Sequence, residues 1–213
     1  MSTSNARVRA PKSRSYRLGK RADKQQETRR RIVEAAVDLH GTLGPARTSF
    51  AQIAERAGVQ RHTFYAHFPD ERSLLMACSG LALERDPLPD PDEWLDEPPG
   101  GSRLKAGLGE IYGWYERNAQ LSACVLRDAE HHQPTQEAVA LRMAPTFGRA
   151  VAVLGEGLSR QARALLAVAL DFGSWRALAS AAPPEGPAAT MSEAIALLNG
   201  NDEADARRRL ALD

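Results

Sequence analysis

Residues 60–68, with the sequence Gln-Arg-His-Thr-Phe-Tyr-Ala-His-Phe, combine hydrogen-bonding and aromatic side chains over a short distance. The Arg61 guanidinium can donate two hydrogen bonds to guanine, and the Gln60 amide can pair with adenine. The methyl group of Thr63 can contact thymine while its hydroxyl reaches a phosphate. These residue types suit the reading of base edges, whereas the two phenylalanines of the segment are expected in the core.

A second polar group invites a metal-site or catalytic interpretation: Cys124, Asp128, Glu130, His131 and His132. Adjacent histidines point about 100° apart on a helix, so both cannot bind one ion from it, although Cys124, Asp128 and either histidine could share a face. A polar helix end before Pro134 is the better account, and we expect neither a metal nor a cofactor. The chain has no nucleophile-elbow, zinc-protease or phosphate-loop motif, so we expect no enzyme.

Helical patterns on both sides would position residues 60–68. Apolar residues at the spacing of one helical face predict a first helix over about 24–43, which a Gly-Pro pair ends. Ser49 and Gln52 then form a capping box for a short second helix that ends at Gly58. Small residues at this end of the helix allow a steep helix crossing, which is typical of a helix-turn-helix.

These residues resemble a known family. The segments Thr-Ser-Phe-Ala-Gln-Ile-Ala-Glu-Arg-Ala-Gly-Val (48–59) and Thr-Phe-Tyr-Ala-His-Phe-Pro (63–69), followed by Leu74-Leu75, look like the DNA-binding domain of TetR-type (TetR/AcrR) transcriptional regulators. The resemblance covers about residues 25–78. It implies an all-α fold with a three-helix, helix-turn-helix DNA-binding domain, followed by a helical domain for ligand binding and dimerisation.

Two positions depart from the family pattern. Gln60 stands where the family usually has Ser, and Gln is a weaker helix cap. Glu71 stands where the family usually has Lys, which removes a phosphate contact. Arg72, the next residue, is a candidate to replace that contact.

The resemblance places the third helix in the major groove of DNA. Thr48 and Ser49, at a helix N-terminus, suit a phosphate, as do the polar tips of Tyr65 and His67. The alternatives are that Ser49 only caps its helix and that Tyr65 and His67 only pack against the first helix. The DNA-binding residues we expect in this domain are Thr48, Ser49, Gln60, Arg61, His62, Thr63, Tyr65 and His67.

Positive charge is concentrated at the N-terminus. Residues 1–31 hold eleven Lys and Arg against two acidic residues, whereas the whole chain has a net charge of only +1. A basic end on an acidic body is typical of a protein that binds a polyanion at that end. Residues 1–22 lack apolar periodicity and are expected to form a flexible arm, in which Arg14, Arg17 and Arg21 are candidates for the minor groove. Diffuse attraction to phosphates and a merely solvated tail are the alternatives.

The rest of the chain is predicted to be helical. Five prolines make residues 86–101 a loop, and helices follow at about 102–118, 119–131, 135–156, 159–181 and 189–199. The expected domains are a flexible basic arm (1–22), a DNA-binding domain (23–70) and a helical effector-binding and dimerisation domain (71–213).

The segment 159–181 is apolar around most of a helical circumference. Leu165, Val168 and Phe172 begin one stripe, and Leu166 and Leu170 lie on the other side. A helix of this kind needs two partners. The second partner fits the family habit of forming a homodimer, which would present two reading helices to a palindrome.

An effector pocket is implied by the resemblance, among the C-terminal helices. Such pockets are mostly apolar, so we expect an apolar or aromatic small molecule. The alternative is that these aromatic and soft residues are simply core. The candidates for ligand binding are Trp114, Cys124, Met143, Phe147, Phe172 and Trp175.

The function we expect is therefore that of a homodimeric transcriptional repressor that a small molecule releases from a palindromic operator. An architectural or partner-dependent DNA-binding protein without an effector is the alternative. No apolar run is long enough for a membrane span and no secretory signal is recognisable, so we expect a cytoplasmic protein. The two cysteines lack the spacing of a zinc site or a disulfide framework.

Overall fold

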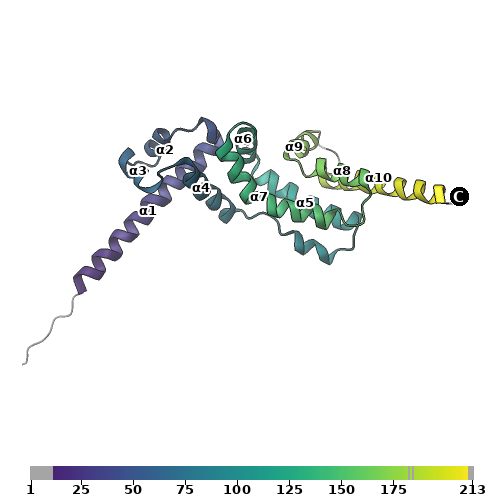
Figure 1. Cartoon of the computed structure of the whole chain (residues 1–213), viewed down its shortest axis with the longest axis horizontal. Helices are drawn as coiled ribbons and strands as arrows, with labels where there is room; N and C mark the ends of the chain where they lie inside the picture. The colour runs from purple at the N-terminus through teal and green to yellow at the C-terminus, as the bar shows by residue number, and fades with distance from the viewer. Residues whose placement is uncertain (1–11, 182, 184, 211–213) are drawn as a thin grey trace, which may run out of the picture.

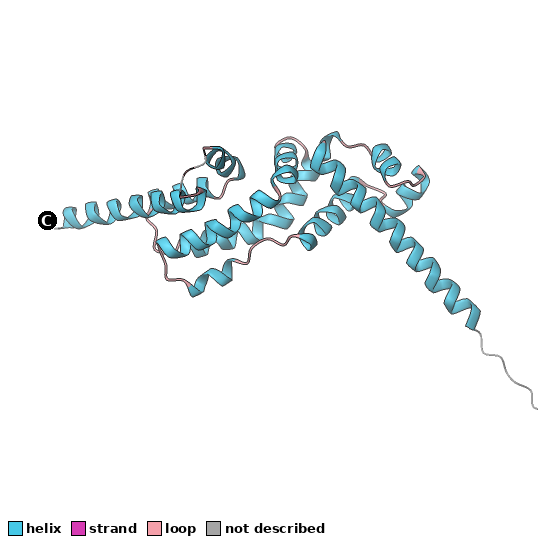
Figure 2. Cartoon of the chain, turned by 180° about the vertical axis from the view of Figure 1, so that it is seen from behind, coloured by secondary structure: helices cyan, strands magenta, loops and turns pink. Residues whose placement is uncertain are grey.

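The computed structural model describes residues 12–181, 183 and 185–210, and over these residues its only regular secondary structure is helical (Figure 2). This confirms the predicted all-α fold. Two 3-10 helices, η1 (Pro45–Arg47) and η2 (Pro91–Asp96), accompany the α-helices. The α-helices are α1 (Lys12–Thr42), α2 (Phe50–Arg56), α3 (Arg61–His67), α4 (Glu71–Arg85), α5 (Gly101–Arg117), α6 (Ala119–Ala129), α7 (Gln133–Leu154), α8 (Arg160–Ala169), α9 (Phe172–Ser180) and α10 (Pro187–Leu210).

Helix α1 begins much earlier than the sequence pattern predicts. It starts at Lys12, and its N-terminal half projects from the rest of the molecule (Figure 1). The prediction of an arm without regular structure is therefore wrong for residues 12–22, and residues 1–11 lie outside the described part of the chain. Arg, Lys, Gln and Ala are good helix formers, and no proline lies within α1. Apolar periodicity marks only the half of the helix that packs.

The N-terminal core is formed by α1, α2, α3 and the first half of α4, with Ala138 of α7 packed against it. Leu74, Leu75 and Cys78 of α4 are buried in this core, so it continues past residue 70, where the sequence placed the domain boundary. The other buried residues of this core are Ile32, Val33, Ala35, Ala36, Ile53, Ala54, Ala57, Phe64, Phe68 and Ala138.

The second core lies between α5, α7, α8, α9 and α10. Trp94 of η2 is buried in it, so the proline-rich loop contributes an anchor. Four aromatic rings, those of Tyr112, Tyr115, Phe172 and Trp175, pack together at its centre. Helix α6 packs against α1, and α7 packs against α4, so these contacts join the two halves of the molecule.

The helix predicted over 159–181 is in fact two helices, α8 and α9. Asp171 caps α9 by accepting a hydrogen bond from the Ser174 amide at 2.7 Å. The hydroxyls of Tyr112 and Tyr115 donate to the carbonyls of Ala169 and Leu170, which end α8. The apolar stripe runs through the break, and it hid this cap from the sequence pattern.

Candidate nucleic-acid interface and cavity

The turn between α2 and α3 is fixed by local hydrogen bonds. Ser49 Oγ accepts from the Gln52 amide at 3.3 Å, and Gln52 Oε1 accepts from the Ser49 amide at 2.8 Å, which confirms the predicted capping box. Gly58 has a φ of 63°, a conformation that favours glycine. Arg31 of α1 donates to the carbonyls of Ala57 and Gly58 at 2.8 and 3.2 Å, and so ties the turn to the long helix.

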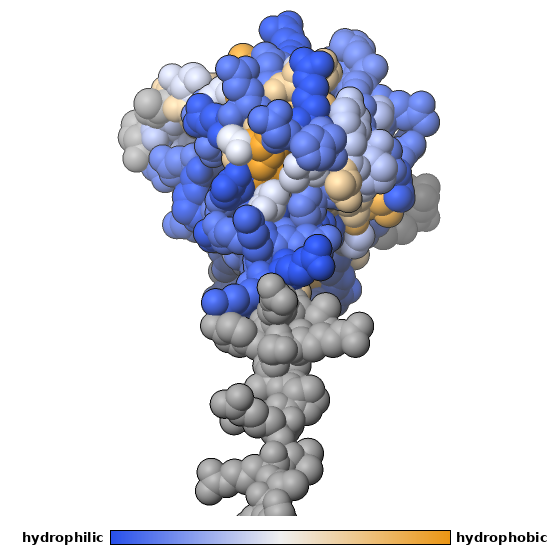
Figure 3. Space-filling view, turned by 90° about the vertical axis from the view of Figure 1, so that its left-hand side faces the viewer, coloured by the Kyte–Doolittle hydropathy of each residue, from blue (hydrophilic) through white to orange (hydrophobic). Residues whose placement is uncertain are grey.

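Helix α3 is anchored by one face and exposed on the other. Phe64 and the capping residue Phe68 are each 1% exposed, which confirms that they belong to the core. Tyr65 is 52% exposed, and Arg61 and His62 are exposed beside it. Figure 3 looks onto this end of the molecule and shows hydrophilic side chains over most of its surface. The helix thus presents polar groups while aromatic packing fixes its position.

The aromatic residue Tyr65 is held by its ring. Its ring packs edge-on against Phe50 and Phe64, with both centroid distances at 5.8 Å. No hydrogen bond of its hydroxyl to another described residue is recorded. The hydroxyl is therefore available to an external acceptor.

The remaining expected DNA contacts divide into engaged and available groups. The Thr48 hydroxyl donates to the Gly44 carbonyl at 2.7 Å, and the Ser49 hydroxyl is used within the capping box. His62 Nε2 and Thr63 Oγ1 lie 3.2 Å apart and form a hydrogen bond. Gln60 caps α3 with its backbone alone, so its amide is available. His67 is half-buried in the last turn of α3.

The expected arm residues lie along the projecting half of α1. Arg21 is exposed, as are Lys20 and Lys24 beside it. Arg14 and Arg17 belong to the same helix, but their side chains lie outside what the structure describes. The helix carries these positions in a straight line away from the N-terminal core (Figure 1).

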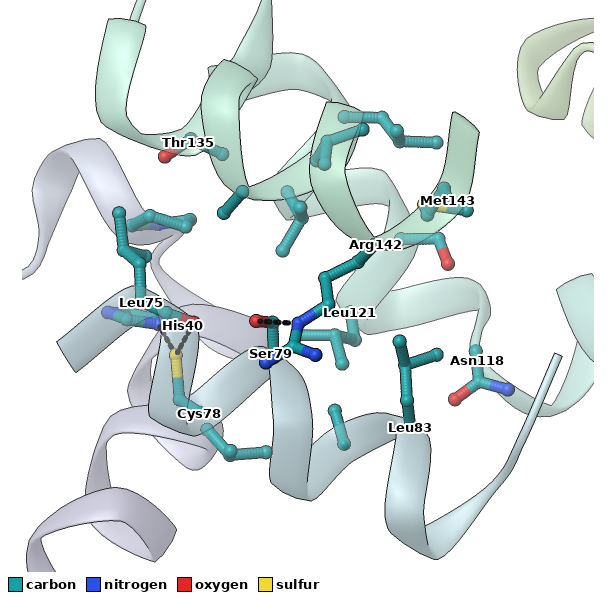
Figure 4. A pocket seen from close by; sticks show the side chains of 18 of the residues that line it. His40, Leu75, Cys78, Ser79, Leu83, Asn118, Leu121, Thr135, Arg142 and Met143 are labelled. Carbon is teal, nitrogen blue, oxygen red and sulfur yellow. Dashed lines mark hydrogen bonds between the residues drawn. The ribbon is translucent and has the colours of Figure 1, made fainter. Parts of the chain in front are cut away.

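A cavity of about 100 Å³ lies between α1, α4, α5, α6 and α7 (Figure 4). Trp114 and Met143, two of the six expected ligand residues, line it. Most of the other walls are aliphatic. The lining residues are Val37, His40, Pro45, Leu75, Cys78, Ser79, Ala82, Leu83, Trp114, Asn118, Leu121, Ser122, Val125, Leu126, Thr135, Ala138, Val139, Arg142 and Met143.

The other four expected ligand residues lie elsewhere. Cys124 Sγ donates to the Gly41 carbonyl at 3.5 Å, and Phe147 stacks on Tyr115. Phe172 and Trp175 are buried in the aromatic centre of the second core. These four residues therefore do not line this cavity, since aromatic character alone does not separate core from cavity wall.

Several polar residues of the cavity were missed from the sequence. His40 is 4% exposed, and its Nδ1 lies 3.4 Å from Cys78 Sγ. Burial lowers the pKa of His40 to about 4, because the desolvation outweighs the opposing effect of Asp128. Burial raises the pKa of the Cys78 thiol to about 12. Both groups are therefore neutral near pH 7.

Arg142 is the most informative of the missed residues. Its Nη2 donates to the Met76 carbonyl at 2.9 Å, and its Nε donates to Ser79 Oγ at 3.4 Å. The cavity draws its wall from helices that are far apart in sequence, so no local motif announces it. Only the charge of an arginine in a mainly apolar helix could have drawn attention to this position.

The polar side chains at residues 124–132 do not come together at one site, because they contact different partners. Asp128 accepts from the Ala46 amide at 2.9 Å and pairs with Arg127, while His132 Nδ1 hydrogen-bonds Thr135 Oγ1. His131 is exposed beside Glu130. Among the described residues, no three His, Cys, Asp or Glu side chains are grouped as metal ligands would be, and no described helix is long and apolar enough to cross a membrane.

The comparison with known families gives a match in the N-terminal domain. Residues 32–78 match the model described as "Bacterial regulatory proteins, tetR family". Among curated proteins, the chain is 46% identical over 55 residues to the HTH-type transcriptional regulator TtgR of Pseudomonas putida. It is 43% identical over 49 residues to the regulator AcrR of Shigella flexneri. These alignments cover 26% and 23%, respectively, of this chain and of each relative.

Solved structures resemble more of the chain. A HlyIIR mutant matches 81% of this chain and 98% of its own length with a TM-score of 0.61 at 17% identity. SCO7518 of Streptomyces coelicolor A3(2) matches the same shares with a TM-score of 0.50 at 25% identity. The likeness in sequence thus covers the N-terminal domain, and the likeness in fold extends to the C-terminal helices.

Proposed function

We propose that this chain, which belongs to the TetR family through its DNA-binding domain at residues 32–78, is a homodimeric repressor that a small molecule releases from operator DNA. The observation that carries this proposal is the arrangement of α3. Its buried phenylalanines fix the helix, and Arg61, His62 and Tyr65 are exposed together on its outer side. A short helix held in this way suits insertion into the major groove.

Within the proposed interface, the residues have different roles. Arg61 and Gln60 would read base edges, since their donors remain available. Tyr65, His67, Thr63 and His62 would contact bases or phosphates at the rim. Thr48 and Ser49 would offer backbone groups more than hydroxyls, because both hydroxyls already bond within the domain. Arg14, Arg17 and Arg21 would add contacts along the duplex.

Exposed apolar residues on the C-terminal helices support the dimer. On α8, Leu166 is 1% exposed and faces the core, whereas Val168 is 49% exposed. On α10, which packs against α8, Leu197 is 70% exposed. We propose that these outer faces of α8 and α10 form the contact between two copies, since large exposed apolar side chains favour association.

The cavity supports control by a small molecule. Its walls include α1 and α4, which also build the N-terminal core. A ligand that fits one arrangement of these helices better than another would shift the protein towards the first arrangement. In the proposed mechanism, the favoured arrangement changes the distance between the α3 helices of the two copies, so that they no longer fit the two half-sites of the operator. Action on DNA would place the protein in the cytoplasm, and no catalytic step takes part.

Selection of bound sequences from random duplex DNA by the full-length protein, at a stated salt concentration, tests the proposal. We expect enrichment of a palindrome, whose half-site spacing reports the distance between two reading helices. The projecting basic half of α1 favours a second candidate, an architectural protein that binds DNA without an effector. Binding that fades with salt and enriches no sequence would support that candidate and contradict the repressor.

A further inference from the structure

We infer that the cavity selects a small apolar acid, whose hydrocarbon part lies among the aliphatic walls and whose carboxylate pairs with Arg142. The inference rests on the proposed function in one respect, since it takes this cavity as the effector site. It also narrows the expectation from sequence, which was an apolar or aromatic small molecule, by adding a carboxylate.

The position of the Arg142 guanidinium is the first support. The side chain points from α7 towards Ser79 of α4, within the group of residues that line the cavity (Figure 4). Its recorded bonds use Nε and Nη2 and go to an alcohol and a carbonyl, both of which are neutral. No hydrogen bond of Nη1 is recorded among the described residues. Among the described residues, no buried side-chain nitrogen lacks a partner, so Nη1 keeps some accessible surface.

Other arginines of the same region are paired with acids. Arg149, also on α7, bonds Asp92, and Arg72 of α4 pairs with Glu137 of α7. Arg142 has no such ion pair among the residues that the structure describes. A cation at the wall of an apolar cavity gains most from an anion that it can hold with two parallel hydrogen bonds.

The charge balance of the cavity is the second support. Its described lining residues include no Asp or Glu. His40 is neutral near pH 7 because its pKa is lowered, and Cys78 is a thiol because its pKa is raised. Asp128 acts on His40 from outside the lining, but its own charge is paired with Arg127. Arg142 is therefore the only charged group among the described wall residues at neutral pH, and it favours an anion over a neutral or cationic ligand.

The size of the cavity limits the hydrocarbon part. An apolar cavity of about 150 Å³ in another protein accepts benzene. The present cavity, at about 100 Å³, is smaller, so it suits a short chain or at most a single ring. Benzoate and hexanoate are therefore suitable probes, and benzamide and hexanamide are their neutral counterparts of the same shape.

The competing explanation is that Arg142 only ties α7 to α4 through its bonds to Met76 and Ser79. That role predicts a loss of stability when the arginine is replaced, but no preference for an acid over its amide. Affinity for the acid relative to the amide therefore separates the two explanations.

The test is calorimetric titration of the full-length, DNA-free protein with the two acids and the two amides at pH 7. We expect each acid to bind about 10- to 100-fold more tightly than its amide, the range for a charge-assisted hydrogen bond. Arg142→Met should remove this preference, and Arg142→Lys should keep part of it. Arg72→Met, which removes an exposed arginine from the same helix pair outside the cavity, should leave it unchanged.

Three results would overturn the inference: equal affinity of the wild-type protein for acid and amide, no binding of either acid, or a preference that survives in Arg142→Met. The wild-type comparison needs no variant, so it stands even if Arg142→Met does not fold. A gel-shift assay with the selected DNA then tests release separately. Acids that bind without releasing DNA would contradict the proposed release mechanism, but the inference that the cavity binds an acid would still stand.

Discussion

Arg61 and Ser49 show how differently two hydrogen-bonding side chains of one surface are used. The Ser49 hydroxyl takes part in the capping box of α2. Arg61, in contrast, is exposed in the first turn of α3 and forms no ion pair with another described residue. Sequence reasoning grouped both as DNA contacts. It could predict the cap from the Ser-x-x-Gln spacing, but it left open whether Ser49 also contacts DNA.

Arg61→Ala should weaken binding to the selected palindrome by about 1–3 kcal/mol, because it removes a side chain that can hold guanine with two hydrogen bonds. The substitution should also relax the sequence preference at one position in each half-site. Binding assays on single-base variants of the palindrome measure both effects. An equal loss on every sequence would instead place Arg61 on a phosphate.

His40 should make folding sensitive to acid. Its pKa is about 4 when folded and 6.5 when unfolded, so the unfolded chain takes up a proton at a pH where the folded chain does not. The free energy of unfolding is therefore not reduced by His40 above about pH 6.5, and it decreases as the pH falls from 6.5 towards 4. The loss should reach about 3 kcal/mol, since one unit of pKa is worth about 1.4 kcal/mol.

This effect is measured by urea unfolding of the wild-type protein and of His40→Gln at several pH values between 7 and 4. The free energy of unfolding is plotted against pH for each protein. The variant should be less stable at pH 7 and should show a flatter dependence on pH. His131→Gln is the matched control, because the His131 side chain is 86% exposed. Parallel curves for wild type and His40→Gln would contradict a buried, neutral His40.

At the scale of elements, an apolar stripe allowed most helices to be predicted, but it did not locate the start of α9, although Asp171 caps that helix. The helices at 102–118, 119–131 and 135–156 match α5, α6 and α7 closely. The projecting half of α1 has helix-forming residues but no apolar stripe. The break between α8 and α9 depends on tyrosine hydroxyls from α5, which no local pattern reveals.

Asp171→Ala should destabilise the protein by about 1 kcal/mol, because it removes the side chain that caps α9. Asp171→Asn keeps a capping oxygen and should lose much less. Thermal unfolding of the two variants beside the wild type checks this. Equal losses in both variants would mean that the charge of Asp171, and not the cap, stabilises this end.

At the scale of the whole molecule, the two proposed sites differ in how far the sequence could predict them. The proposed base-reading residues, at positions 60–67, lie within one short stretch, so their spacing alone brings them onto α3 or its N-cap. The cavity gathers His40, Ser79 and Arg142 from three helices, and only tertiary packing brings them together. Of the expected ligand residues, Trp114 and Met143 reach it because α5 and α7 each turn one face towards it.

Deletion of residues 1–22 should flatten the salt dependence of DNA binding, because it removes basic positions from the projecting half of α1. The slope of log affinity against log salt should fall by about 0.9 for each phosphate that the shortened protein no longer neutralises. Gel-shift titrations at several salt concentrations measure the slope. A variant with Arg14, Arg17 and Arg21 changed to Gln is the matched control, since it keeps the full helix. An unchanged slope in both would leave this segment without a role in binding.

The continuity of α1 also has a mechanical consequence. Val37 and His40 in the cavity wall and Lys20 in the basic half belong to one unbroken helix, with about 30 Å between His40 and Lys20 at 1.5 Å per residue. In the proposed mechanism, the helix would thus act as a lever whose short end lines the cavity. A tilt of about 10° at His40 would sweep Lys20 through about 5 Å, roughly one helical turn. A small displacement at the cavity would thereby be amplified where the chain would meet the phosphate backbone.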